Sequence, residues 1–266
     1  MSPWESLLLG VVQGATEFLP VSSSGHLVMS QVVLGVDLPG ILFEVVVHVA
    51  TLASVLWVYR ARVGRLVAGS ARAEGDALRY VGLLLLASVP AGVVGVFFKD
   101  ALESLFDRPF VAGVALLVTG ALLWSTLAAR RWRGEDEGTQ PGPRDALLMG
   151  LAQAVAIVPG ISRSGTTVVV GLWLGVEARE AAAFSFLMSV PAIAGAAVLS
   201  IPDLSGGSVA AVGAAPFALG GVAAAFTGVL AIRTFVAMLE NRSFHRFALY
   251  CWLVGSAFLA YLLLRP

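Results

Sequence analysis

The chain has 266 residues, of which 58% are hydrophobic and only 13% are charged, and its mean hydropathy is +0.88. So few charges cannot cover a water-exposed surface, so the composition excludes a soluble domain and indicates a polytopic membrane protein. Basic and acidic residues number 17 each. Because they leave no net field to attract nucleic acid, we expect no nucleic-acid partner.

In chain order, two interrupted apolar regions alternate with uninterrupted ones that reach the length of about 20 residues needed to span a bilayer. We expect an interrupted region at 4–34, spanning helices at 39–60, 77–98 and 109–130, a second interrupted region at 144–175, and spanning helices at 179–200, 212–236 and 245–264. Pro, Gly and Ser residues at 20–25 and 159–165 make the two interruptions. Each half is too short to span, which predicts re-entrant helical hairpins, with a kinked span as the alternative.

The two interrupted regions match each other at an offset of 140 residues. Twelve residues of the first are repeated in the second: Pro3, Leu7, Leu8, Gly10, Gln13, Ser22, Ser24, Gly25, Val28, Leu34, Gly35 and Val36. The pattern predicts an all-α fold in one membrane domain, 1–266, with repeat one at 1–133, a linker at 134–140 and repeat two at 141–266. Each repeat would hold a re-entrant hairpin and three transmembrane helices.

Three spans are an odd number, so the second repeat is expected to be inverted relative to the first, as in transporter folds. The distribution of charge agrees. Thirteen of the seventeen basic residues fall on one side if Arg179 and the loops 60–79, 130–144 and 233–246 share it. By the positive-inside rule, both chain termini and the opening of the site then lie on the outer, periplasmic face.

The first break carries polar side chains that are costly at bilayer depth, which favours a functional site. Glu17 follows Gln13 by four residues, so both lie on one helical face and could hold Mg²⁺ or Ca²⁺ through their oxygens. Glu17 is alternatively a general base. Ser22, Ser23, Ser24 and Gly25 form a turn rich in donors, in which one hydroxyl could attack phosphorus.

His26 follows this turn and has a pKa suited to proton transfer near neutrality. Whether Ser23 or His26 is the nucleophile is left open by the sequence. Glu44 and His48 lie four residues apart on the first predicted span and are expected to border the site.

Arg163 lies in the second break, where a guanidinium requires an anionic partner and matches the oxygens of a phosphate. A structural ion pair with Glu17 is the alternative. The half-helices that follow the two breaks would direct free N–H groups at the same place, which also favours an anion. Together these groups predict hydrolysis of a lipid phosphate.

Two further patterns concern packing. Gly10-x-x-x-Gly14 predicts a close helix contact through small residues. The sequence Ser-Val-Pro-Ala occurs at 88–91 and at 189–192, where Pro is expected to kink or pack spans near the site.

Two motifs, Gln13-x-x-x-Glu17-Phe-Leu-Pro-x-Ser-Ser-x-Gly-His26 and Pro159-Gly-x-Ser-Arg-Ser-x-x-Thr167, resemble the signatures of the undecaprenyl-diphosphate phosphatase family, which is associated with bacitracin resistance. The resemblance implies an enzyme of the bacterial inner membrane that recycles the lipid carrier of cell-wall synthesis and depends on a divalent metal. Many relatives have Glu at the position of Gln13, which weakens a charge-based metal role there.

From the residues and the resemblance we expect a polyprenyl diphosphate substrate and the following site. The catalytic residues would be Glu17, Ser23, His26 and Arg163; the substrate-binding residues Ser22, Ser24, Gly25, Ser162, Ser164, Thr167, Glu44 and His48; and the metal ligands Glu17 and Gln13. A homodimer is compatible with this reading. The competing hypothesis is an inverted-repeat transporter or flippase of a lipid phosphate.

Overall fold

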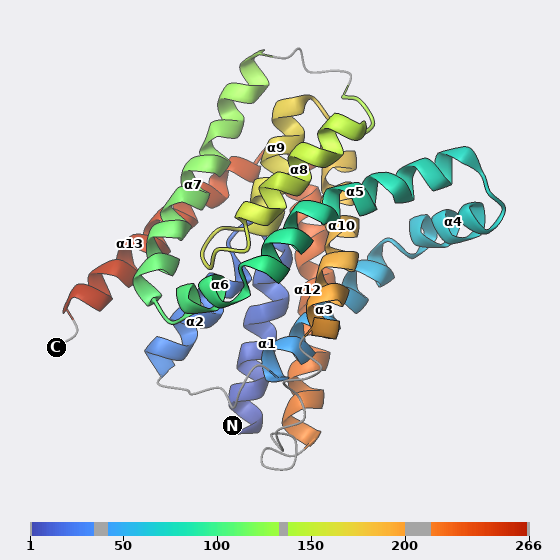
Figure 1. Cartoon of the computed structure of the whole chain (residues 1–266). Helices are drawn as coiled ribbons and strands as arrows, with labels where there is room; N and C mark the ends of the chain where they lie inside the picture. Colours follow the sequence, from blue (N-terminus) through green and yellow to red (C-terminus); the bar gives the residue numbers. More distant parts are fainter. Residues whose placement is uncertain (1, 35–41, 133–137, 200–213, 265–266) are drawn as a thin grey trace.

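The computed structural model describes residues 2–34, 42–132, 138–199 and 214–264. These residues form helices, with one isolated bridge between Thr139 and Val176. The helices are α1 (Pro3–Phe18), α2 (Ser23–Leu34), α3 (Leu42–Val58), α4 (Arg60–Ala71), α5 (Gly75–Phe97), α6 (Lys99–Phe106), α7 (Pro109–Trp132), α8 (Pro143–Val155), α9 (Arg163–Leu174), α10 (Ala178–Leu199), α12 (Ala214–Glu240), η2 (Phe244–Arg246) and α13 (Phe247–Leu264) (Figure 1). The predicted all-helical class is confirmed.

Five helical segments of the described chain are long and apolar enough to cross a membrane: α5, α7, α10, α12 and η2 with α13. They correspond to five of the six predicted spans. The sixth prediction, 39–60, holds only in part, because α3 ends at Val58 and reaches spanning length only together with α4, from which it is bent by 82°. Helix α4 and the end of α5 that follows it project from the rest of the molecule (Figure 1). The protein is therefore a multi-pass membrane protein with five or six candidate spans.

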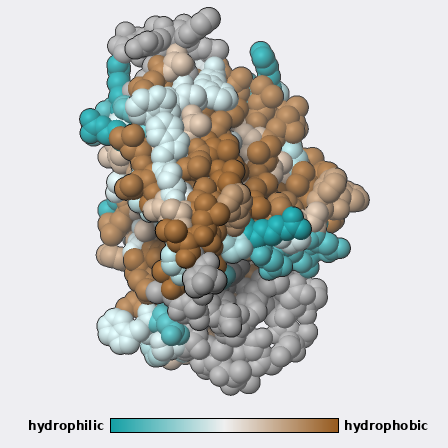
Figure 2. Space-filling model, turned by 90° about the vertical axis from the view of Figure 1, so that its left-hand side faces the viewer, coloured by the Kyte–Doolittle hydropathy of each residue, from teal (hydrophilic) through white to brown (hydrophobic). Residues whose placement is uncertain are grey.

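Hydrophobic side chains cover much of the face drawn in Figure 2, and hydrophilic ones lie in separate patches toward its edges. Such a surface suits contact with lipid, since large exposed apolar areas are rare on soluble monomers. Residues 134–137 of the predicted linker lie outside the described part of the chain.

Each interrupted region forms two short helices, as the sequence predicted. Helix α1 ends at Phe18 and α2 begins at Ser23, while α8 ends at Val155 and α9 begins at Arg163. Pro20 and Pro159 contribute no N–H to a helix, which favours a break at these positions. Inside the breaks, Ser22 and Gly160 have left-handed φ values of 66° and 97°.

Helix α1 packs closely against α12, as the Gly-x-x-x-Gly pattern predicted. A methyl group on Gly10 would lie 2.2 Å from the carbonyl oxygen of Gly220, and one on Gly14 would lie 2.2 Å from that of Ala224. Only hydrogen atoms fit between these backbones, which fixes α1 against α12.

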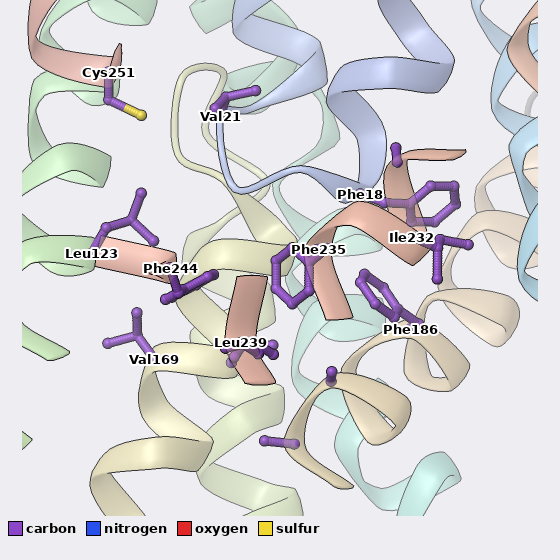
Figure 3. Close-up of a cluster of buried hydrophobic side chains, with 14 of the residues drawn as sticks. Phe18, Val21, Leu123, Val169, Phe186, Ile232, Phe235, Leu239, Phe244 and Cys251 are labelled. Atoms are coloured by element: carbon purple, nitrogen blue, oxygen red, sulfur yellow. The ribbon is translucent and has the colours of Figure 1, made fainter. Parts of the chain in front are cut away.

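A chain of phenyl rings forms the largest core cluster beneath the first break. Phe18 meets Phe186 edge-to-face at 5.5 Å between centroids, Phe186 meets Phe235 at 5.0 Å, and Phe235 meets Phe244 at 5.2 Å. In Figure 3, Phe235 lies between Phe186 on one side and Phe244 on the other, with Val21 of the break above them. The rings connect α1, α10, α12 and η2, so the end of α1 rests on a rigid base.

Candidate active site

Glu17, on the last turn of α1, lies at the centre of a hydrogen-bond network and is only 7% exposed. Its Oε1 accepts from Nη2 of Arg163 at 2.5 Å. Its Oε2 accepts from the hydroxyl of Ser23 at 2.6 Å and from Nε2 of Gln13 at 2.8 Å, and lies 3.7 Å from Nε2 of His48. A buried carboxylate needs such donors to stay charged.

The ion pair connects the two helix breaks, which are 146 residues apart at this contact. Nη1 of Arg163 is buried and has no hydrogen-bond partner in the structure. The guanidinium therefore keeps donors for a further anion while it holds Glu17. Arg163 thus forms the ion pair with Glu17 that the sequence analysis gave as an alternative. Its remaining donors could still bind a phosphate.

The two breaks share a capping hydrogen bond, although their backbones differ, because φ is 66° at Ser22 and −75° at Ser162. The hydroxyl of Ser22 accepts from the backbone N of Gly25 at 3.3 Å, and that of Ser162 accepts from the backbone N of Gly165 at 3.1 Å. Each hydroxyl thus satisfies a free N–H in the first turn of the following helix. The turns also contact each other, because the backbone N of Gly160 donates to the hydroxyl of Ser22 at 3.1 Å.

Thr119 of α7 supports the second break from behind. Its hydroxyl donates to the carbonyl of Gly160 at 2.8 Å and accepts from the backbone N of Ser162 at 3.0 Å. Both polar groups of an irregular backbone are satisfied in this way, which is required where water is excluded.

His26 is held between two partners. Its Nδ1 lies 2.8 Å from the carbonyl of Ser22, and its Nε2 lies 2.8 Å from the hydroxyl of Tyr250 on α13. A carbonyl only accepts, so Nδ1 carries the hydrogen and Nε2 accepts from Tyr250. The two rings stack at 5.7 Å between centroids and 9° between planes.

A cavity of about 880 Å³ lies beside Glu17. Its polar end contains seven of the predicted site residues: Glu17, Ser22, Ser23, Ser24, His48, Ser162 and Arg163. The rest is mainly apolar and is lined by α5, from Ser88 to Val96, and by α10, from Pro191 to Val198. Both Ser-Val-Pro-Ala segments contribute to this wall, so the prediction that they lie near the site is confirmed.

The other predicted residues whose side chains the structure describes do not line this cavity. The hydroxyl of Thr167 donates to the carbonyl of Arg163 at 2.7 Å and lies 2.6 Å from that of Ser185. The hydroxyl of Ser164 donates to the carbonyl of Leu19 at 3.2 Å. These two residues hold α9 in place, while Gly25 permits close contact with Gly160. The side chain of Glu44 lies outside the described residues.

The predicted metal ligands are not arranged around a common point. Gln13 presents its NH₂ group to Glu17, so its Oε1 faces elsewhere and has no hydrogen-bond partner. Among the side chains that the structure describes, Glu17 is the one carboxylate in this network, and it is already neutralised by Arg163. Among the described residues, no three His, Cys, Asp or Glu side chains are grouped as for a metal ion. The described side chains therefore do not fit a resident divalent cation.

Sequence reasoning assigned no role to Gln153, Thr119 or Tyr250. Gln153 on α8 is 2% exposed and lines the cavity. Its match to Gln13 at the repeat offset was the signal that could have identified it. Thr119 and Tyr250 lie within predicted spans, and a single hydroxyl in an apolar span does not indicate a functional residue.

These features define a class: an all-helical, multi-pass membrane protein with a buried ionic site at the end of an apolar cavity. Residues 6–257 match the family described as bacitracin resistance protein BacA, and the chain belongs to this family. It is 41% identical to an undecaprenyl-diphosphatase of Desulfatibacillum aliphaticivorans over 96% of this chain and 97% of that one. Undecaprenyl-diphosphatases of Methanobrevibacter smithii and Alkaliphilus metalliredigens are 39% and 40% identical, over 94% and 99% of this chain and 94% and 100% of theirs. The family resemblance inferred from the two motifs is confirmed.

Proposed function

We propose that this protein hydrolyses undecaprenyl diphosphate to undecaprenyl phosphate and inorganic phosphate within the membrane. The observation that carries the proposal is the hydroxyl of Ser23, which lies 2.6 Å from the carboxylate of Glu17 while Arg163 occupies the other carboxylate oxygen. Membership in the BacA family supports the substrate, and it supports roles in recycling the carrier lipid for cell-wall synthesis and in bacitracin resistance.

The first step is attack of Ser23 Oγ on the terminal phosphorus. Glu17 accepts the hydroxyl proton, the P–O bond to the bridging oxygen breaks, and undecaprenyl phosphate leaves with the electron pair. The free donors at Nη1 of Arg163 bind the terminal phosphoryl oxygens, on which charge is concentrated.

The second step hydrolyses the phosphoserine and regenerates the free hydroxyl of Ser23. Glu17 first releases the proton of Ser23 to solvent. Water then attacks the phosphorus of the phosphoserine and gives a proton to Glu17, and the bond from phosphorus to Ser23 Oγ breaks as Oγ takes that proton from Glu17. Inorganic phosphate is released. Glu17 serves as base in both steps because it is the acceptor that touches Ser23 in the structure.

We assign His26 a positioning role in place of the proton transfer that the sequence suggested. Both of its ring nitrogens are bonded, to Ser22 and to Tyr250, and the ring does not line the cavity. His26 would hold the carbonyl of Ser22 and thereby fix the turn that presents Ser23. His48, 3.7 Å from Glu17, is the imidazole on the cavity side and would contact the phosphate.

The polyprenyl chain would occupy the apolar part of the cavity between α5 and α10. Three glycines of this wall, Gly92, Gly95 and Gly195, have open space where a side chain would project. Small residues leave width for an isoprenoid chain, and apolar walls favour its burial.

The divalent ion stays a prediction from the sequence, and no catalytic step is assigned to it. A Mg²⁺ or Ca²⁺ ion at Glu17 and Gln13 would require the amide to turn over and Arg163 to release part of the carboxylate. Loss of turnover in EDTA, with recovery on adding Mg²⁺ or Ca²⁺, would support such a rearrangement. Unchanged turnover in EDTA would remove the ion from the reaction.

Placement in the membrane is part of the proposal. We keep α1 with α2 and α8 with α9 as re-entrant hairpins of two inverted repeats, with the chain termini and the site opening on the periplasmic face of a bacterial inner membrane. The number of basic residues in the segments 60–79 and 233–246 supports this orientation. A homodimer also stays a prediction.

Release of phosphate from undecaprenyl diphosphate by the purified protein in detergent tests the activity. Ser23→Ala and Arg163→Ala should each lower kcat by a factor of about 10³ or more, since each removes a group that acts on the reacting phosphorus. Ser125→Ala on α7 and Arg65→Ala on α4 make the same changes away from the cavity and should retain activity.

Full activity of Ser23→Ala or Arg163→Ala would overturn the assignment. A wild-type protein that binds the lipid and moves it across a vesicle membrane without releasing phosphate would favour the transporter hypothesis instead.

A further inference from the structure

Gln153 is a buried amide for which the structure provides no partner. It lies on α8, is 2% exposed and lines the cavity that Arg163 also lines. Neither its Nε2 nor its Oε1 makes a hydrogen bond. Buried polar groups in folded proteins are nearly always paired, so an unpaired amide facing a cavity indicates a ligand that supplies the missing bonds.

The matching glutamine of the first half explains why this amide is free. Gln13 donates to Glu17, which follows it by four residues on the same helical face. The residue four positions after Gln153 is Ile157, whose side chain can accept no hydrogen bond. Helix α8 thus keeps the amide and lacks the carboxylate that would occupy it.

The position of α8 indicates which part of a substrate Gln153 would meet. Helix α8 packs against α9, which carries Arg163, and against α5, which lines the apolar wall. Gln153 therefore belongs to a helix that contacts both neighbours. One is α9, whose Arg163 would bind the terminal phosphate, and the other is α5, whose apolar wall would hold the lipid chain. The lipid-linked phosphate must lie between those two groups.

We propose that Gln153 binds the lipid-linked phosphate of the diphosphate and donates from Nε2 to the oxygen that becomes negative when undecaprenyl phosphate leaves. The proposal rests on the hydrolytic function given above and adds a group that stabilises the leaving phosphate. In the first step Ser23 Oγ bonds to the terminal phosphorus and the bridging oxygen takes the electron pair of the broken bond. Nε2 of Gln153 strengthens its hydrogen bond as that charge forms.

Inhibition by the two products separates this role from a role at the terminal phosphate. Gln153→Leu should lower kcat/KM for undecaprenyl diphosphate by about ten- to a hundredfold, as expected for a lost bond to a charged group. It should weaken inhibition by undecaprenyl phosphate to a similar degree and leave inhibition by inorganic phosphate unchanged. Gln153→Glu, of equal size, should weaken binding of the lipid phosphate further because two anions would then face each other.

Stability gives a second readout, because an unpartnered amide contributes no hydrogen bond to the fold. Gln153→Leu should therefore unfold at the wild-type temperature or above it. Gln31→Leu makes the same chemical change on α2, outside the cavity lining, and should keep wild-type kinetics.

Two results would overturn the proposal: undiminished inhibition of Gln153→Leu by undecaprenyl phosphate, or equal weakening of inhibition by both products. A variant that fails to fold would also contradict it, since the amide would then be structural. If the proposed hydrolytic function itself is wrong, the wild-type protein will release no phosphate, which distinguishes that outcome from a wrong role for Gln153.

Discussion

In both helix breaks a serine hydroxyl caps the following helix, Ser22 toward Gly25 and Ser162 toward Gly165, at 3.3 and 3.1 Å. The side chains that follow the two capping serines differ in kind. The first break presents the hydroxyl of Ser23, and the second presents the guanidinium of Arg163 at the matching position. The same capping hydrogen bond thus occurs twice, and the proposed nucleophile and the cation are divided between the two breaks.

The same division extends along the helices before the breaks. Glu17 in α1 accepts from Gln13, whereas Ile157 follows Gln153 in the second half. The comparison teaches that similar local structure does not imply similar chemistry. It also identifies positions at which the halves should respond differently to the same substitution.

Beyond the site residues themselves, the largest effect is expected where the halves contribute alike, at the apolar wall of the cavity. Gly95→Leu on α5 and Gly195→Leu on α10 should each lower kcat/KM for undecaprenyl diphosphate by about tenfold or more, because the new side chain occupies space now open for the lipid. Activity on a short-chain prenyl diphosphate should fall less. Phosphate-release kinetics on both substrates measure the difference.

Gly82→Leu on α5 is the matched control for this pair. Gly82 also has open space around it but does not line the cavity. Equal losses on long and short substrates would contradict the proposed path of the lipid chain.

A smaller effect, on stability, should distinguish the two capping turns. A methyl group on Gly25 would lie 2.9 Å from the backbone of Gly160, while one on Gly165 would lie 3.1 Å from its nearest neighbours, which include Pro20. Gly25→Ala should therefore lower the free energy of unfolding by about 1–3 kcal/mol, and Gly165→Ala by less. Thermal unfolding in detergent measures both, and a more damaging Gly165→Ala would contradict the order.

The smallest effect is expected at the contact between His26 and Tyr250. Tyr250→Phe removes one hydrogen bond and keeps the stacked ring, so kcat should fall about fivefold, equivalent to about 1 kcal/mol. Tyr261→Phe on the same helix should have no effect. A loss of a thousandfold would show that His26 takes part in the chemistry directly and would overturn its positioning role.

Much of the helical architecture could be predicted from the sequence, because length, hydropathy and Pro or Gly residues determine where apolar helices begin and end. The bend after Val58 was missed, since no Pro or Gly lies between residues 42 and 60 and only tertiary structure sets the 82° angle. The meeting of Glu17 and Arg163 was predicted because buried opposite charges must pair.

The orientation of individual side chains could not be predicted in the same way. A motif that contains His26 or Thr167 does not reveal that one side chain faces Tyr250 and the other faces Ser185. Helical spacing places a residue on a face, but the neighbours of that face come from distant helices.

The contact between α1 and α12 can form only after α12 has been synthesised. The hydroxyl of Ser6 donates to the carbonyl of Pro216, 210 residues later in the chain, which corresponds to about 10 to 40 s of synthesis on the ribosome. Until α12 is inserted, α1 lacks the helix against which it packs most closely. We therefore expect a chain that ends before α12 to have no turnover.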